Sequence, residues 1–104
     1  MRALSDAEIA EANLAGWTHT SGALRVSFAV PDYETAARFI TDVAHLAETA
    51  NHHPDLSLRY GVLDVVLRTH HRDLGVTDLD VDMAGQITVL AAARLLEVRR
   101  SEAC

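Results

Sequence analysis

The stretch ALRVSFAVPDYETAARFITDVAHLAETANHHP, residues 23–54, contains the clearest structural pattern in this sequence. Its first part, Ala23–Phe28, alternates apolar and polar side chains, which is typical of a strand with one buried face. Pro31 ends that strand, and Asp32 is placed to cap a helix that should run to about Ala50. The helix has one apolar stripe, formed by Ala36, Phe39, Ile40, Val43, Leu46, Ala47 and Ala50. A strand followed by an amphipathic helix predicts a fold in which the helix covers a sheet.

The residues that precede this stretch predict a short helix and one more strand. Ser5 and Glu8 match a capping box, in which the two side chains satisfy free backbone amides reciprocally. The helix that they begin should run to about Asn13. Trp17–Thr20 then predicts a strand that forms a hairpin with the next strand across a serine-glycine turn.

The residues that follow the stretch predict a second strand pair and a last helix. Leu56–Tyr60 and Val62–Thr69 have strand patterns, with one apolar and one mixed face. Thr77 and Asp80 are spaced like another capping box, so the last helix should begin there and fade at Arg99-Arg100. The predicted order α-β-β-α-β-β-α is that of an α+β fold, a four-stranded antiparallel sheet with helices packed on one face. We expect residues 1–104 to form a single domain.

Composition argues against several classes of function. The chain has 9 Lys and Arg against 15 Asp and Glu, and this net charge of −6 disfavours binding to nucleic acid or to an anionic membrane. No segment approaches the ~18 apolar residues of a membrane span, and the first residues do not match a signal peptide. The one cysteine, Cys104, excludes an internal disulfide and a metal site built on several cysteines. We therefore expect a soluble protein in a reducing, cytoplasmic setting.

Four of the six histidines occur as two adjacent pairs at the ends of predicted elements. His52 and His53 follow the long helix, and His70 and His71 end the last strand. Glu48 precedes His52 by four residues, which places both on one helix face. If the last two strands pair, we expect imidazoles from both segments to converge around a single dry-walled cavity. Histidine titrates near neutral pH, so such a cavity suits general acid and base catalysis.

The same residues also allow simpler interpretations. Glu48 and His52 could form a surface pair, and Asp80 could serve only as the acid of the capping box. Tyr60 is more readily explained by core or strand packing than as a proton donor. A zinc site that includes Glu48 is a further alternative. Consecutive histidines disfavour it, because their rings point in divergent directions from a turn or a strand.

The spacing of these residues resembles the signature of the pterin-4a-carbinolamine dehydratases. The matching positions are Glu48-x-x-x-His52-His53-Pro54, Tyr60, His70 and Asp80. The segments Leu14–Trp17, Phe39–Glu48 and Gly75–Asp80 are similar to flanking segments of the same family. The similarity extends from about residue 10 to about residue 90, which is most of the chain.

The resemblance implies a saddle-like α+β subunit that pairs sheets into a homodimer and commonly packs helices into a homotetramer. It implies dehydration of 4a-hydroxytetrahydropterin, the pterin-4a-carbinolamine, to quinonoid dihydropterin and water. This step recycles the pterin after aromatic amino-acid hydroxylation. The pterin is the substrate, and the family uses no metal and no bound cofactor of its own.

The resemblance also implies which residues act. Catalytic histidines would be His52, His53 and His70, with Glu48 and Asp80 as their supporting carboxylates. Substrate contacts are implied for these three histidines and for Pro54, Thr69, His71 and Arg72.

The chain departs from the family pattern at three places. Leu56 stands where an aromatic residue is common, and Asn51 stands where some relatives have an acid. The loop from His70 to Gly75 is one residue longer than the usual spacing. The alternative function is therefore a non-catalytic, oligomeric interaction module of the same fold. A small protein that binds a metal through His and Glu is a less favoured alternative.

Overall fold

Strand β2 (Ala23–Ala29) lies in the middle of an antiparallel sheet, as its alternating pattern predicts. On one side it pairs with β4 (Val62–Leu67), which pairs in turn with the edge strand β3 (Asp55–Arg59). On the other side it pairs with the short strand β1 (Thr18–Thr20). The predicted α+β class and the four-stranded antiparallel core of the sheet are confirmed.

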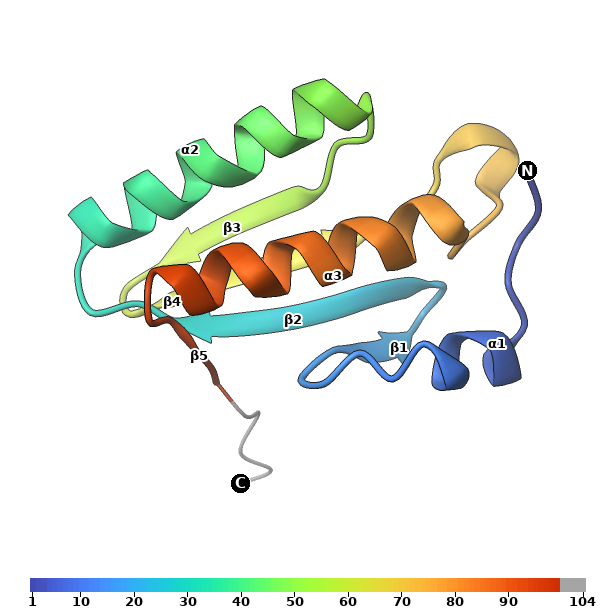
Figure 1. Cartoon of the computed structure of the whole chain (residues 1–104), viewed down its shortest axis with the longest axis horizontal. Helices are drawn as coiled ribbons and strands as arrows, with labels where there is room; N and C mark the ends of the chain where they lie inside the picture. Colours follow the sequence, from blue (N-terminus) through green and yellow to red (C-terminus); the bar gives the residue numbers. More distant parts are fainter. Residues whose placement is uncertain (100–104) are drawn as a thin grey trace.

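The two long helices cover one face of this sheet, and the short helix α1 (Asp6–Glu11) lies near β1 (Figure 1). Helix α2 (Tyr33–Ala50) begins at the predicted cap, because the Asp32 carboxylate accepts a hydrogen bond from the Thr35 backbone N–H at 2.7 Å. Helix α3 (Asp78–Ala93) lies beside it. The buried core between helices and sheet includes Leu24, Val26, Phe28, Phe39, Val43, Leu63, Val65, Leu67, Met83 and Ile87.

A fifth strand, β5 (Glu97–Val98), occupies residues for which the sequence predicts helix, and it pairs with the far end of β2. Helix α3 stops at Ala93 because Leu95 adopts a left-handed conformation, with φ of +61°. The Leu96 N–H then bonds the Ala91 carbonyl, and the Leu96 side chain turns into the core. The structure is a computed structural model that describes residues 1–99. The expectations for Arg100, as the end of the last helix, and for Cys104 lie outside the described residues.

The turn between β3 and β4 contains Tyr60, which is 93% exposed. The interpretation of Tyr60 as core or strand packing is therefore wrong. Strand β3 ends at Arg59, and Gly61 completes the turn with a φ of +73°. This turn is at the opposite end of the β3–β4 hairpin from Pro54 and Thr69. Within residues 1–99, no helix combines the length and apolarity needed to cross a bilayer.

Candidate functional site

The end of α2 sets the position of His52. Asn51 adopts a left-handed conformation with φ of +51°, which asparagine tolerates better than most residues. The N–H groups of Asn51 and His52 bond the carbonyls of Glu48 and Ala47, respectively, and this arrangement closes the helix. The chain thus reverses at Asn51 and brings His52 beneath the surface, where it is only 9% exposed. This backbone conformation is a physical reason for asparagine at position 51.

The buried His52 ring is paired with the carboxylate of Asp80. The distance between His52 Nε2 and Asp80 Oδ1 is 2.6 Å, and Asp80 is fully buried. Asp80 also accepts a hydrogen bond from the Thr77 backbone N–H at 2.9 Å, as the predicted capping box requires. Asp80 is therefore both the capping acid of α3 and the partner of a histidine 28 residues away along the chain.

Two buried hydroxyl groups extend this contact into a network. Thr69 Oγ1 lies 2.8 Å from Asp80 Oδ2 and 2.7 Å from Thr77 Oγ1. The network joins the end of α2, the segment after β4 and the start of α3, which lie at one end of the molecule (Figure 1). The predicted approach of these segments is confirmed. The sequence predicts Thr77 only as a helix cap, and the spacing between Thr77 and Asp80 is the one sequence signal for this second contact.

The expectation of one dry-walled cavity lined by several imidazoles is wrong, because His53, His70 and His71 are exposed. Glu48 bonds His53 and not His52, with 2.5 Å between Glu48 Oε2 and His53 Nε2. The left-handed turn at residue 51 takes His52 off the helix face that carries Glu48. The His53 and Glu48 side chains are 57% and 78% exposed, so they form a surface pair.

The loop after β4 carries the remaining candidates. A backbone bridge joins Thr69 to Gly75, with the Thr69 N–H bonding the Gly75 carbonyl at 2.7 Å. Arg72 and Asp73 both have positive φ, +55° and +51°, inside a short 3₁₀ turn. The turn thus lies beyond the bridge between Thr69 and Gly75, and Thr69 remains in the network.

The candidate substrate contacts differ in their access to solvent. His71 and Arg72 are exposed, and Pro54 is half-buried at the start of β3. Thr69 is buried, and its hydroxyl is directed to Asp80 and Thr77. Of the implied contact residues, Thr69 therefore belongs beneath the site.

The pairing with Asp80 leaves one His52 nitrogen free for chemistry. An ionised carboxylate only accepts hydrogen bonds, so the neutral ring carries its proton on Nε2 and a lone pair on Nδ1. Within residues 1–99, every fully buried side-chain nitrogen or oxygen has a hydrogen-bond partner. The Nδ1 atom of His52 has no hydrogen-bond partner among the same residues. Nδ1 is therefore not fully buried, and its lone pair is available to accept a proton from a ligand. Among these residues, no group of three or more His, Cys, Asp or Glu side chains is arranged to hold a metal ion.

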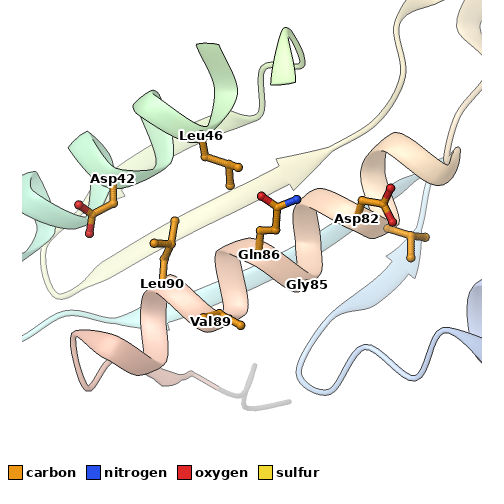
Figure 2. A pocket seen from close by; sticks show the side chains of 8 residues that line it. Asp42, Leu46, Asp82, Gly85, Gln86, Val89 and Leu90 are labelled. Carbon is orange, nitrogen blue, oxygen red and sulfur yellow. The ribbon is translucent and has the colours of Figure 1, made fainter. Parts of the chain in front are cut away.

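A second surface feature is a groove of about 620 Å³ between α2 and α3 (Figure 2). It is lined by Asp42, Leu46, Val81, Asp82, Gly85, Gln86, Val89 and Leu90. This lining has no histidine and no member of the His52–Asp80 network. The groove offers apolar contact area, whereas the groups suited to proton transfer lie at the end of α2.

Comparison with known proteins confirms the family resemblance found in the sequence. A family model described as pterin 4 alpha carbinolamine dehydratase matches residues 2–90. A provisionally named pterin-4-alpha-carbinolamine dehydratase from Roseiflexus sp. (strain RS-1) is 43% identical over 86 residues, covering 81% of this chain and 91% of the relative. A second provisionally named one, from Mycobacterium leprae (strain TN), is 38% identical over 89 residues, covering 84% and 94%.

Solved structures give the same fold. The crystal structure of a transcriptional coactivator/pterin dehydratase from Brucella melitensis matches with a TM-score of 0.80 and 37% identity, covering 86% of this chain and 99% of that chain. A pterin dehydratase-like protein identified as a RuBisCO assembly factor in the alpha-carboxysome matches with a TM-score of 0.56 and 20% identity, covering 66% and 79%. At that lower identity the likeness concerns the fold alone.

Proposed function

Because the chain belongs to the pterin-4-alpha-carbinolamine dehydratase family, we propose that it dehydrates a 4a-hydroxytetrahydropterin to quinonoid dihydropterin and water. The main structural support is the buried pair of His52 and Asp80, with 2.6 Å between Nε2 and Oδ1. This pair holds one imidazole in a defined orientation and leaves its Nδ1 lone pair without a partner among residues 1–99. The proposal requires no metal and no resident cofactor, since the pterin is the substrate.

The reaction needs two proton transfers. The bond between C4a and the hydroxyl oxygen breaks, and the oxygen leaves as water after it receives a proton. The proton on N5 departs to a base, and the electron pair of the N5–H bond forms the new C4a=N5 double bond. A positioned acid and a positioned base each contribute about 10²–10⁴ to the rate.

We assign the base to His52 Nδ1. When the ring takes the N5 proton it becomes an imidazolium, and the adjacent Asp80 carboxylate stabilises that charge. We assign the acid to His70, which is exposed and directly follows Thr69 of the same network. His53, oriented by Glu48, would hold the pterin at the rim together with Pro54, His71 and Arg72.

The test is kinetic. An aromatic amino-acid hydroxylase generates the carbinolamine, and the appearance of quinonoid dihydropterin is followed with and without the chain. We expect acceleration over the spontaneous reaction that saturates with substrate. The control variant is His45→Ala, which removes an exposed histidine within α2 and should keep full activity. Absence of acceleration by the wild-type chain would contradict the proposal.

A non-catalytic interaction module of the same fold is the second candidate, and a specific observation favours it. His53, His70 and His71 are exposed, so the described residues do not bury the rings around one closed cavity. The same assay separates the two functions, because a pure interaction module leaves the spontaneous rate unchanged at every protein concentration.

We also propose that the groove between α2 and α3 receives a second copy of the chain (Figure 2). Val89 is 69% exposed beside apolar walls that include Leu46 and Leu90, so one surface carries both a ridge and a groove. A two-fold axis would place the Val89 ridge of each copy in the groove of the other. In sedimentation velocity, Val89→Arg should give a smaller oligomer than the wild type, whereas Tyr60→Ser at the hairpin tip should not. An unchanged oligomer in Val89→Arg would contradict this contact.

A further inference from the structure

We infer that Thr69 and Thr77 are positioning residues that hold the Asp80 carboxylate in the orientation in which its Oδ1 meets His52. Both threonines are buried, so their hydroxyl groups act inside the protein. The kinetic part of this inference rests on the proposed dehydratase function. Its spectroscopic part rests only on the hydrogen-bond geometry.

The direction of every proton in the network follows from the donors available. The Asp80 carboxylate only accepts, so the Thr69 hydroxyl must donate its proton to Oδ2, 2.8 Å away. That proton is then committed, and the contact of 2.7 Å between the two threonine hydroxyls must be a donation from Thr77 to Thr69. Thr77 Oγ1 in turn accepts from the Leu79 backbone N–H at 3.3 Å. Each hydroxyl thus donates one hydrogen bond and accepts at least one. No other assignment of the two hydroxyl protons satisfies these contacts.

This order determines what remains for His52. Oδ2 of Asp80 is occupied by two donors, the Thr69 hydroxyl and the Thr77 backbone N–H. Oδ1 is therefore the oxygen that faces His52, and it must receive a proton from Nε2. The two donors on Oδ2 also fix the rotation of the carboxylate about its Cβ–Cγ bond. The threonines thereby keep Oδ1 in line with Nε2 and orient the imidazole, whose tautomer is set by the carboxylate itself.

The network also connects the two proposed proton-transfer residues. Thr69 directly precedes His70, and its backbone is fixed by the hydrogen bond to Gly75. One buried hydroxyl therefore links the segment that carries the proposed acid to the carboxylate that orients the proposed base. Loss of this hydroxyl should disturb the relative placement of the two histidines.

The test compares Thr69→Val, which removes the hydroxyl at nearly constant volume, with Thr69→Ser, which restores it. In the wild-type chain, nitrogen-15 NMR should show His52 with a protonated Nε2 and an unprotonated Nδ1. We expect Thr69→Val to move the His52 Nε2 shift, because the Asp80 carboxylate loses a donor on Oδ2 and can rotate, and Thr69→Ser to return the shift to its wild-type value. The kcat should fall about threefold to tenfold in Thr69→Val, as for the loss of one hydrogen bond, with KM nearly unchanged.

The control is Thr88→Val, a half-buried threonine on α3 whose hydroxyl accepts a hydrogen bond from the Trp17 indole at 2.9 Å. It should lower stability to a similar degree and leave the His52 shifts unchanged. Unchanged His52 shifts in Thr69→Val, or equal changes in Thr88→Val, would overturn the inference.

If Thr69→Val does not fold, Thr77→Ala provides the second test. It removes the donor to Thr69 and should move the His52 shifts in the same direction by a smaller amount, and unchanged shifts would contradict the positioning role. A wild-type chain without dehydratase activity would refute the proposed function, whereas the nitrogen shifts would still decide whether the threonines position the Asp80 carboxylate against His52.

Discussion

His52 and His53 are consecutive, and each is paired with a carboxylate, yet the two pairs lie in opposite environments. The His52 and Asp80 side chains are 10% and 0% exposed, whereas those of His53 and Glu48 are 57% and 78% exposed. The buried pair has two further donors on its carboxylate, the Thr69 hydroxyl and the Thr77 N–H. In the exposed pair, Glu48 is bonded to His53 alone among the side chains of residues 1–99.

The contrast shows that two pairs of the same residue types, a histidine with a carboxylate, can differ widely in how much each contributes to the structure. An exposed ion pair typically contributes 0–1 kcal/mol and is weakened by salt, so its geometry is easily lost. Breaking a buried pair leaves an unpaired polar group away from water, which is far more costly. The buried pair is therefore the one that can hold a ring in a single tautomer during a reaction.

The most severe way to break the buried pair is His52→Ala. We expect kcat for the proposed dehydration to fall by about 10²–10⁴, because the base itself is removed. His70→Ala should cost at least about tenfold for the same reason, applied to the acid. His53→Ala should cost less and act mainly on KM. Steady-state kinetics on all three variants checks this order, and equal losses in His52→Ala and His53→Ala would erase the contrast between the pairs.

The second prediction concerns Asp80→Asn, which keeps the shape of the side chain paired with His52 and changes which atom carries the proton. In Asp80→Asn the side-chain oxygen must face the Thr77 N–H, so the amide NH₂ faces His52 and donates to Nε2. The ring is then forced to carry its proton on Nδ1, which is the wrong tautomer for a base. We expect kcat to fall by about tenfold to 100-fold and unfolding to become easier by about 1–3 kcal/mol. Nitrogen-15 NMR and chemical denaturation measure the two effects, and an unchanged tautomer would refute the explanation.

The third prediction uses a pair of intermediate exposure, Asp42 on α2 with Arg94 at the end of α3. Hydrogen bonds from Arg94 hold the pKa of the Asp42 carboxyl below its usual value. A lowered folded pKa stabilises the protein above the unfolded pKa, and this stability is lost as pH falls through the folded value. Asp42→Asn should therefore lower Tm at neutral pH, by an amount that reflects about 1 kcal/mol or less.

The difference in Tm between wild type and Asp42→Asn should shrink as pH falls below about 4. Thermal denaturation across this range is the measurement. Glu34→Gln is the matched control, since Glu34 pairs with Arg38 on the exposed face of the same helix. A pH-independent difference for Asp42→Asn would show that charge is not the cause.

The smallest effect is expected for the exposed pair. Glu48→Gln should change stability by less than about 0.5 kcal/mol and should change kcat/KM by less than about threefold, since two largely exposed side chains bind each other weakly. Added salt should remove even that difference. A loss of tenfold or more in kcat/KM would mean that the bound pterin covers this pair and excludes water from it. The two pairs would then have to be compared in the ligand-bound site.

The ends of the two long helices show how much of the fold could be predicted from the sequence. Both α2 and α3 end in the same hydrogen-bond pattern around a left-handed residue. In α2 that residue is Asn51, before a histidine pair and a proline, so the predicted end at Ala50 is confirmed. In α3 it is Leu95, a residue that rarely adopts this conformation. The burial of Leu96 in the core favours it, and local propensity could not reveal the resulting strand β5.

The candidate site shows the same division between local and tertiary information. Only the resemblance to the family signature places His52 and Asp80 in one site, since the residues alone predict Asp80 as the capping acid of a helix. Spacing could not reveal that Glu48 bonds His53, since the turn at Asn51 rotates His52 away from the helix face. It also could not show which rings are buried, because that depends on how α3 packs beside the end of α2.

The bridge between Thr69 and Gly75 has a consequence for how this protein can be altered. Residues 70–74 form a loop, and the backbone hydrogen bond between Thr69 and Gly75 joins its two ends. The number of residues in this loop can therefore change without moving Thr69 and the buried hydrogen-bond network, because the bridge fixes both ends of the loop. The loop of residues 70–74 is therefore a suitable segment for a mutant library. Insertions or substitutions there should change ligand preference while His52 and Asp80 stay in place.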